Sequence, residues 1–246
     1  MDFMKENYNR NELLQYPNSL EQAIGIQKKW AKFVSKENAP GIELGDINLV
    51  AGVDLVYLED DINEYGFACA VLWDVKEQQE VSHEFSTGKV EFPYISGLLA
   101  FREILIASKA LEKLSPQPDV LFFDGHGRAH PHRFGAATAI GVAMNIPSIG
   151  VAKKPLINVH DWKKIERKVG KTIPIIDEEE TIGYVIVLKD KSSPVFVSVG
   201  YRIKLDTAVK LTLTTAKTHK QPESLGRAHD YLQTQKYDLF NEIIKK

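Results

Sequence analysis

Residues 119–152 constrain the fold most, because they read as a strand, a helix and a second strand in close succession. The run "DVLFFD" is short and apolar between its acids, as in a strand buried on both faces. Small apolar residues over roughly 133–144 predict a helix, and "SIGVA" follows as another strand. Such a unit is expected to be parallel and right-handed. The chain should therefore contain part of a parallel sheet.

The segment 134–152 carries no charged side chain and is long enough to suggest a membrane helix. Pro147 should stop a helix there, so a buried helix followed by a buried strand explains the segment better, and we expect no membrane partner. The N-terminal "MDFMKENYNRNELLQ" has no apolar signal core, and the single Cys69 cannot form an intramolecular disulfide. Both features predict a cytoplasmic protein.

The remaining elements surround this unit. Ser19 and Gln22 form a capping-box pattern, which predicts a helix to about residue 35. Apolar and β-branched runs predict further strands at 47–58, 65–75, 79–88, 181–189 and 194–203. The first three should form an antiparallel meander, and the last two a hairpin around "DKSS". Helical periodicity covers 96–114, and helices are expected to close the chain. We predict one α/β domain over residues 1–246, with a mixed sheet and helices on its faces.

Three carboxylates stand where acids are unusual. Asp54 lies within the apolar strand "AGVDLVYL", where burying a charge is costly without a partner. Asp124 ends its strand at an edge where binding sites collect, although an acid there can also be a simple cap. Glu103 is the one charge in the apolar stripe of its helix, so it marks an exposed edge, a buried ion pair or a functional group.

These acids come from a strand, a later helix and a following strand, and they could converge on one point. Oxygen ligands select hard cations such as Mg²⁺ or Mn²⁺, which suit phosphodiester hydrolysis. The net charge is −2, so no global basic field indicates a nucleic-acid partner. The lysine-rich stretch 151–171 is either a solvated face or part of a phosphate-binding surface.

Residues 120–135, "VLFFDGHGRAHPHRFG", place His126, His130 and His132 close to Asp124. Histidines at this density could form a zinc site, belong to an acid/base pair or occupy a polar loop. Zinc would make the chain a metallohydrolase of another class. The residues alone leave these three interpretations open.

Five blocks, in chain order, resemble the endonuclease V family of deoxyinosine 3′ endonucleases: "AGVDLVY", "PYISGLLAFRE", "FFDGHGRAHPHRFG", "IGVAKKPL" and "PESLGRAHDY". They run from about residue 49 to 230, which is most of the chain. Each block is moderately specific, and five in order are very specific. The resemblance implies an RNase H-like fold, which agrees with the predicted meander followed by parallel strands.

The resemblance also implies residue roles. Asp54, Glu103 and Asp124 would be the catalytic carboxylates that hold Mg²⁺, with Mn²⁺ able to substitute. His229 matches a fourth metal-site position, although by itself it reads as a surface or capping histidine on a short C-terminal helix. His130 and Lys153 match positions that contact the phosphate near the scissile bond. The motif constrains His126 and His132 less, which disfavours zinc.

The block "PYISG" resembles the wedge that enters the duplex while the damaged base turns into a pocket. Tyr94 would be the wedge, and the substrate-binding positions would be Tyr94, Gly97, Leu99, Gly125 and Gly127. Glycine at 125 and 127 suits a backbone that must approach a base or phosphate closely. Ser96 stands where the commonest bacterial form has proline, so the rigidity of the wedge and its range of lesions could differ. Without the resemblance, Pro93 and Tyr94 would form an ordinary strand-to-helix turn.

The resemblance implies a Mg²⁺-dependent repair nuclease that hydrolyses the second phosphodiester bond 3′ to a deoxyinosine and leaves 3′-hydroxyl and 5′-phosphate ends. An enzyme acting mainly on inosine in RNA is the near alternative, because the sequence does not place the contacts that would read a 2′-hydroxyl. A zinc hydrolase built on the three histidines is a distant alternative. A non-catalytic nucleic-acid-binding relative is disfavoured by the retained carboxylates. We expect inosine-containing DNA as the partner and a monomeric protein.

Overall fold

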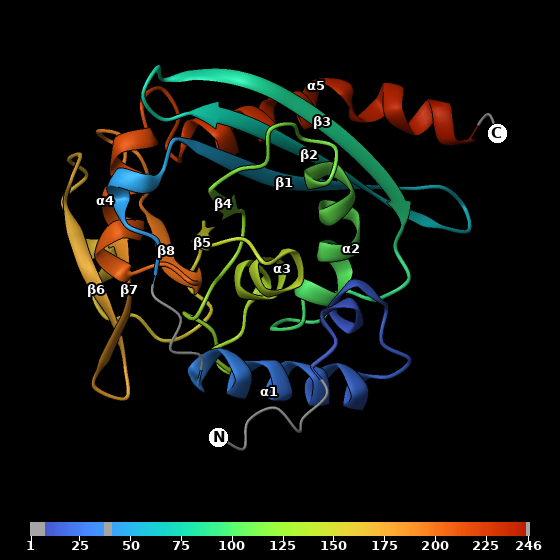
Figure 1. The fold of residues 1–246 in the computed structure, drawn as a ribbon, viewed down its shortest axis with the longest axis horizontal. Coiled ribbons are helices and arrows are strands. Elements are labelled where there is room, and N and C mark those ends of the chain that lie inside the picture. Colours follow the sequence, from blue (N-terminus) through green and yellow to red (C-terminus); the bar gives the residue numbers. More distant parts are fainter. Residues whose placement is uncertain (1–7, 37–40, 245–246) are drawn as a thin grey trace.

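A computed structural model of the protein describes residues 8–36 and 41–244. Its centre is one sheet with the strand order β3-β2-β1-β4-β5-β8-β7-β6 (Figure 1). Both parallel and antiparallel neighbours occur in it, so the predicted mixed α/β sheet is confirmed.

The antiparallel meander consists of β1 (Leu49–Glu59), β2 (Glu64–Asp74) and β3 (Gln79–Lys89). Tight turns connect them because an aspartate closes each one. Asp60 accepts hydrogen bonds from the N–H groups of Ile62 and Asn63, and Asp74 does the same for the two residues after Val75. The predicted meander is confirmed.

The central parallel unit consists of β4 (Val120–Phe123), α3 (Ala136–Met144) and β5 (Ser148–Ala152). β4 pairs in parallel with β5, as predicted, and also pairs in parallel with β1, which the sequence did not indicate. α3 begins three residues later than expected and ends at Asn145, whose φ of 56° is left-handed. Residues 124–135 are therefore a loop at the end of β4.

The far side of the sheet holds β8 (Val195–Tyr201), β7 (Glu180–Ile186) and β6 (Thr172–Asp177). The predicted hairpin of β7 and β8 is confirmed. β6 was not predicted, because its alternation of Ile173 and Ile175 with exposed neighbours is short and Pro174 within the run argues against a strand. Pro174 fits an edge strand, where a missing N–H is tolerated.

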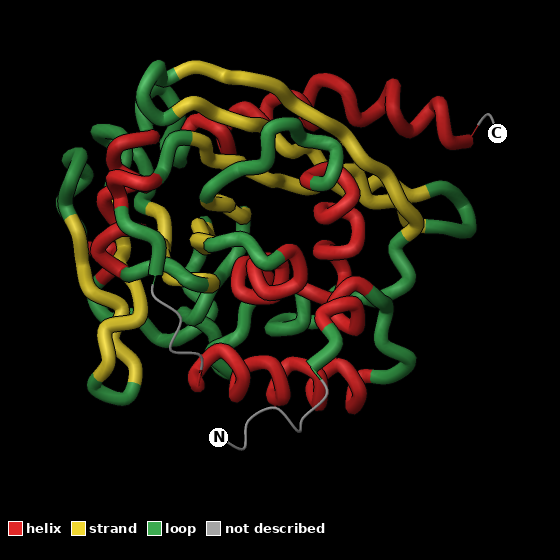
Figure 2. Tube along the Cα trace, in the orientation of Figure 1, coloured by secondary structure: helices red, strands yellow, loops and turns green. Residues whose placement is uncertain are grey.

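Helices cover both faces of the sheet (Figures 1 and 2). α2 (Ala100–Leu111) and α3 pack on one face, and α4 (Leu205–Thr215) and α5 (Glu223–Ile244) pack on the other. α2 is shorter than the predicted 96–114, because Gly97 before it has a φ of 84°, outside helical geometry. Single turns of 3₁₀ helix lie at Arg10–Leu14, Leu44–Asp46 and Trp162–Lys164.

α1 (Leu20–Lys36) begins as the capping pattern predicted, since the Gln22 N–H donates to Ser19 Oγ at 3.1 Å. The reciprocal bond differs from a standard capping box, because Gln22 Oε1 accepts from the N–H of Asn18 at 2.6 Å.

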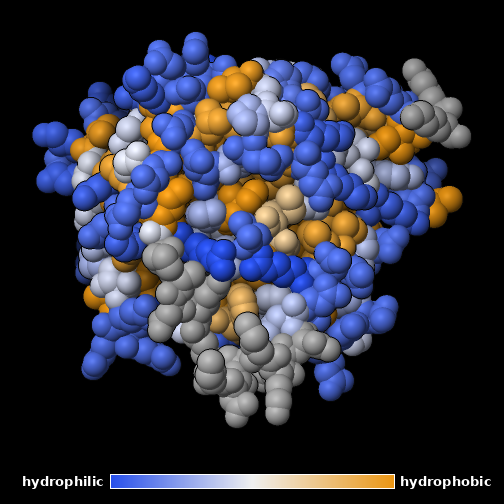
Figure 3. Space-filling view, in the orientation of Figure 1, coloured by the Kyte–Doolittle hydropathy of each residue, from blue (hydrophilic) through white to orange (hydrophobic). Residues whose placement is uncertain are grey.

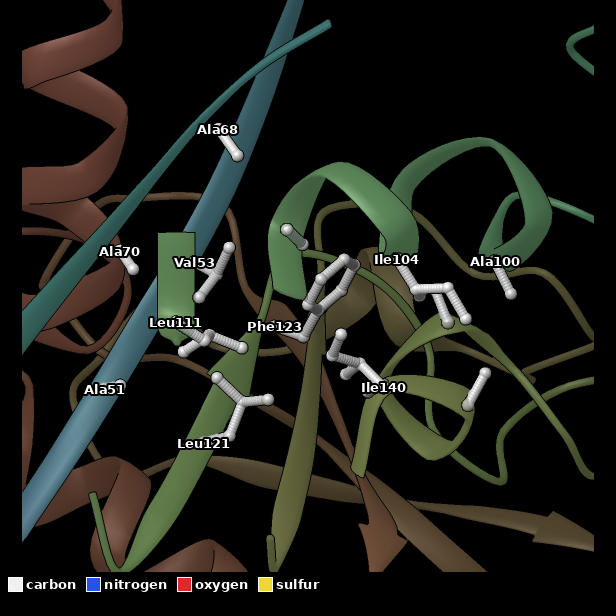
Figure 4. Close-up of a cluster of buried hydrophobic side chains, with 14 of the residues drawn as sticks. Ala51, Val53, Ala68, Ala70, Ala100, Ile104, Leu111, Leu121, Phe123 and Ile140 are labelled. Atoms are coloured by element: carbon white, nitrogen blue, oxygen red, sulfur yellow. The ribbon is translucent and has the colours of Figure 1, made fainter. Parts of the chain in front are cut away.

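The largest apolar cluster lies between the sheet and α2 and α3. Figure 4 shows Ala51 and Val53 of β1 on the same side as Ile104 of α2 and Ile140 of α3. Alanines at 68, 70 and 100 keep this layer thin, so that α2 lies close to the strands. This close packing lets a side chain on α2 reach the sheet, which matters for the site.

On the face drawn in Figure 3, apolar areas are broken up by hydrophilic side chains. None of the helices in the described ranges combines the length and apolarity needed to cross a membrane. Residues 1–7 of the N-terminal stretch considered for secretion lie outside the described residues, so that interpretation stays a prediction.

Candidate functional site

Two of the three predicted carboxylates meet because their strands are neighbours. Val53 of β1 is paired with Phe123 of β4, so the next residues, Asp54 and Asp124, follow side by side at one end of the parallel pair. The N–H of Asp124 also donates to the carbonyl of Val53 at 3.2 Å. Adjacent parallel strands therefore place two acids at one edge.

Glu103 of α2 is 7% exposed and shares this environment. Its Oε1 accepts a hydrogen bond from the Tyr57 hydroxyl at 2.7 Å, whereas its Oε2 is buried without a hydrogen-bond partner. Burial, together with the charges of Asp124 and Asp54, raises its pKa to about 8. Its burial excludes an exposed edge, and it forms no ion pair with any described residue, since the neighbouring Arg102 pairs with Glu64.

His229 and Lys153 contact the two aspartates. His229 Nδ1 lies 2.7 Å from Asp54 Oδ2, and this hydrogen bond raises the pKa of His229. The Lys153 ammonium contacts Asp124 Oδ2. Burial and the nearby Asp54 raise the pKa of Asp124 to about 6 despite this lysine. Burial acts to lower the pKa of Lys153, but the Asp124 carboxylate outweighs it and leaves that pKa raised.

His229 reaches Asp54 because α5 crosses directly over β1. A Cβ on Gly52 would overlap the backbone of Ser224 and Leu225, so this close crossing requires glycine. The helix that carries His229 spans Glu223–Ile244 and is therefore not the short helix expected.

The oxygen-rich donor set fits a hard divalent cation. The unpartnered Glu103 Oε2 and the mutual repulsion of three carboxylates are features that a bound cation would relieve. As the side chains stand, no group of three His, Cys, Asp or Glu within the described ranges is arranged to hold an ion. The aspartates are instead engaged by His229 and Lys153.

The histidine-rich loop forms no common metal centre, because its rings face different partners. His126 Nε2 lies 2.9 Å from the Lys154 carbonyl. His130 Nε2 donates to the Gly97 carbonyl at 2.9 Å, and its Nδ1 accepts from the His132 N–H at 3.0 Å. Both nitrogens of His130 are thus used inside the protein, and burial lowers its pKa to about 4. Its predicted phosphate contact stays a prediction.

Gln27 of α1 organises this loop and was missed from the sequence. Its amide nitrogen donates to the carbonyls of Gly97 and Phe134, at 2.7 and 3.0 Å. Its Oε1 therefore accepts from His132 Nδ1, at 2.7 Å. Gln27 is 1% exposed between the buried Ala23 and Trp30, so a polar residue in an apolar stripe was the available signal, as it was for Glu103.

A pocket of about 330 Å³ opens beside the carboxylates. The predicted Tyr94, Gly97, Leu99 and Gly125 line it, together with Ser96, His126, His130 and Lys154. Tyr94 is 71% exposed, as a side chain that enters another molecule must be. Such a pocket can accept a flat polar ring turned out of a stack.

Gly127 is absent from the wall of this pocket and packs against β8. A Cβ there would overlap the carbonyl oxygen of Val199, and its N–H donates to Ser198 Oγ at 3.0 Å. At Gly125, by contrast, a Cβ would make ordinary contacts of 3.4 Å with Phe123 and 3.6 Å with Ala136. Glycine is therefore required at 127 because the backbone of β8 approaches closely there. Substrate binding by Gly127 stays a prediction.

The lysine-rich stretch 151–171 is mainly solvated, with local ion pairs such as Lys164–Asp161 at 2.6 Å and Lys171–Glu166 at 2.9 Å. Its first two lysines differ from the rest. Lys153 contacts Asp124, and Lys154 lines the pocket.

Comparisons with known proteins agree with this geometry. Residues 28–230 match the sequence profile of the endonuclease V family. Endonuclease V of Dictyoglomus thermophilum is 39% identical over 211 residues, covering 86% of this chain and 88% of that protein. The crystal structure of the Bacillus subtilis protein superposes with a TM-score of 0.82 at 30% identity, covering 92% and 94% of the two chains.

A third relative was solved with nucleic acid. Ciona intestinalis endonuclease V, in complex with a 24mer DNA containing an inosine followed by a ribo-adenosine, superposes with a TM-score of 0.78 at 27% identity. The match covers 89% of this chain and 99% of that one. The mixed sheet described above is the RNase H-like fold of these neighbours.

Proposed function

Because the chain belongs to the endonuclease V family and is therefore a nuclease, we propose that it is a Mg²⁺-dependent repair enzyme for deoxyinosine. It would hydrolyse the second phosphodiester bond 3′ to the lesion. The observation that carries the proposal is the meeting of Asp54, Glu103 and Asp124, from three different elements, beside a pocket sized for a base. The complex of the Ciona relative with inosine-containing DNA supports this substrate class.

Asp54, Glu103 and Asp124 would hold the metal, with His229 as a fourth group. Mg²⁺ bound there would polarise the phosphodiester and lower the pKa of an attacking water, and Mn²⁺ could replace it. Water oxygen bonds to phosphorus as the bond from phosphorus to O3′ breaks, which leaves a 3′-hydroxyl and a 5′-phosphate.

Lys153 and His229 supply charge and orientation. The Lys153 ammonium already lies at Asp124, so it is placed to balance negative charge that develops on the phosphate. The hydrogen bond between His229 Nδ1 and Asp54 Oδ2 fixes the rotamer of that carboxylate.

The pocket would receive the hypoxanthine base while Tyr94 fills the gap left in the stack. Extrusion costs least at a mispaired base, which favours a deaminated site over an intact pair. His126 lines this pocket, and its Nε2 must donate to the Lys154 carbonyl, which leaves its Nδ1 as a buried acceptor without a partner among the described residues. We expect the enzyme to act as a monomer in the cytoplasm.

The test uses matched oligonucleotides that carry inosine or adenine at one position, as duplex DNA, single-stranded DNA and RNA. Incubation with Mg²⁺ should cut only the inosine-containing DNA, at the second bond 3′ to inosine, and EDTA should stop the reaction. Preferential cutting of the RNA strand would show that the enzyme acts mainly on inosine in RNA and not in DNA. Cleavage sustained by zinc alone would refute the magnesium site.

A matched pair of variants on one helix tests the carboxylates. Glu103→Gln should abolish cleavage, whereas Glu112→Gln, an exposed change at the end of α2, should leave it unchanged. Normal turnover by Glu103→Gln would remove Glu103 from the proposed site.

A further inference from the structure

A second cleft, also of about 330 Å³, borders the carboxylates and is distinct from the base pocket. Lys153 and His229, the partners of Asp124 and Asp54, form one wall of it. The base pocket shares none of its residues but begins at the next chain positions, since Gly125 follows Asp124 and Lys154 follows Lys153. Both openings therefore adjoin the two aspartates, one through Gly125 and the other through Lys153 and His229.

The loop between α4 and α5 forms another part of the wall, and it carries an amide without a partner among the described residues. Gln221 is 5% exposed and lines the cleft, and its side chain makes no hydrogen bond to any described residue. Neither amide atom is among the fully buried atoms without a partner, so the amide opens to the cleft, where a ligand can supply hydrogen-bond partners. A glutamine amide can donate hydrogen bonds through its nitrogen and accept them through its oxygen.

One lysine in this cleft has no counter-charge. Lys153 contacts Asp124, and the two nitrogens of His219 lie 3.0 Å from Glu223 and 2.9 Å from Asp230. Lys220 is exposed at the cleft and forms no ion pair with the described part of the chain. An ammonium group without a counter-charge favours the binding of a phosphate group.

The loop is held in place before any ligand arrives. Glu223, 2% exposed, accepts from the N–H groups of Thr218 and His219 at 2.6 and 3.0 Å. A Cβ on Gly226 would overlap the His219 ring, so glycine lets that ring pack against α5. A preformed wall lowers the entropy cost of binding.

We propose that this cleft binds the nucleotide on the 3′ side of the cleaved bond, with Lys220 at a phosphate and Gln221 at a sugar or base edge. This inference rests on the proposed function. A strand whose inosine occupies the base pocket passes the carboxylates and continues on the other side. Because the bond cut is 3′ to inosine, the segment that continues there is the 3′ segment.

Binding of the product strand tests the cleft without cleavage. The probe is a 5′-phosphorylated single-stranded octanucleotide with a 3′ fluorophore, titrated in Mg²⁺ at several salt concentrations. Lys220→Ala should weaken binding about three- to tenfold and reduce the salt slope by about 0.7, the value for one phosphate contact on a single strand. Lys217→Ala, an exposed lysine of the same loop that does not line the cleft, should change neither.

Gln221→Met separates binding from folding. It keeps the volume of the side chain and removes its hydrogen-bonding groups, which have no protein partner to lose. The melting temperature should hold, while affinity for the octanucleotide falls about three- to tenfold. A lower melting temperature with unchanged affinity would show that Gln221 is structural and would overturn its proposed role.

A cleavage assay distinguishes the proposed nuclease function from the proposed role of the cleft. Inosine substrates truncated just beyond the cut should lose kcat/KM relative to longer ones, and Lys220→Ala should lessen that difference. If the wild type fails to cut inosine DNA, the proposed function fails, whereas binding that depends on Lys220 and Gln221 still supports the cleft. If it cuts normally while truncation and both variants change nothing, the cleft inference is overturned.

Discussion

Two glycines in one loop should respond oppositely to the same added methyl group. At Gly125 a Cβ would lie 3.4 Å from Phe123 and 3.6 Å from Ala136, which are ordinary contacts, and φ there is not in the left-handed region. Gly125→Ala should therefore change the free energy of unfolding by less than about 1 kcal/mol, with a small gain from the less flexible unfolded chain. At Gly127 the methyl would overlap the Val199 carbonyl, well inside the 3.0 Å limit for real Cβ contacts.

Relief of that overlap must move β8. The Val199 carbonyl accepts from the Arg128 N–H at 2.7 Å, so shifting it also disturbs the loop. Overpacking of this kind costs roughly 3 kcal/mol, which lowers the melting temperature by about 6–12 °C in a chain of this size. Thermal unfolding of the two variants measures the contrast directly.

Catalytic activity per folded molecule should show the opposite contrast, with Gly125→Ala more damaging than Gly127→Ala. Gly125 and Ala136 both line the base pocket, so the methyl of Gly125→Ala occupies space that the base needs. One methyl group in a fitted pocket is worth about ten- to hundredfold in kcat/KM. An oligonucleotide with an abasic residue puts no base in the pocket, so its residual cleavage should match the wild type. Wild-type kcat/KM on inosine by a stable Gly125→Ala would refute the assignment of the pocket.

Three further outcomes test the site. In EDTA, the protonated form of Glu103 is favoured in the folded state, because burial raises its pKa to about 8. Stability should thus fall by about 1.4 kcal/mol per pH unit as pH rises from the ordinary glutamate range to about 8. Glu103→Gln should flatten this profile most between about pH 6 and 8, above the raised pKa of Asp124, and a parallel pH profile for both proteins would contradict it. Tyr94→Ala should impair nicking of duplex substrate roughly ten- to hundredfold more than cleavage of single strands, and equal slowing at saturation would contradict a wedge. Gln27→Met removes the side-chain donor to the Phe134 carbonyl and the acceptor for His132 Nδ1, and leaves the Gly97 carbonyl with His130 as its side-chain donor, so KM for inosine DNA should rise more than kcat falls. A loss in kcat alone would place Gln27 with the chemistry instead.

Local patterns in the sequence predicted most strands and singled out all three carboxylates. A short apolar run specifies a buried strand wherever it pairs, so β1, β4 and β5 could be located, and Asp54 and Asp124 with them. The capping pattern at Ser19 worked for the same reason, since a helix start depends on neighbouring residues. Glu103 stood out because a charge in an apolar stripe is anomalous under any packing. The edge strand β6 was missed because its alternating run is only six residues long and contains Pro174, which argues against a strand.

Tertiary structure alone decided which groups meet. His229 contacts Asp54 across 175 positions of sequence, through the crossing of α5 over β1 that Gly52 allows. Gln27 joins α1 to two loops whose residues lie 70 and 107 positions away. The same packing assigns Gly125 to a pocket and Gly127 to β8, although the two glycines are nearly adjacent. Periodicity reports whether a residue is buried, because burial follows from local geometry, whereas its partner depends on how distant elements close and pack together.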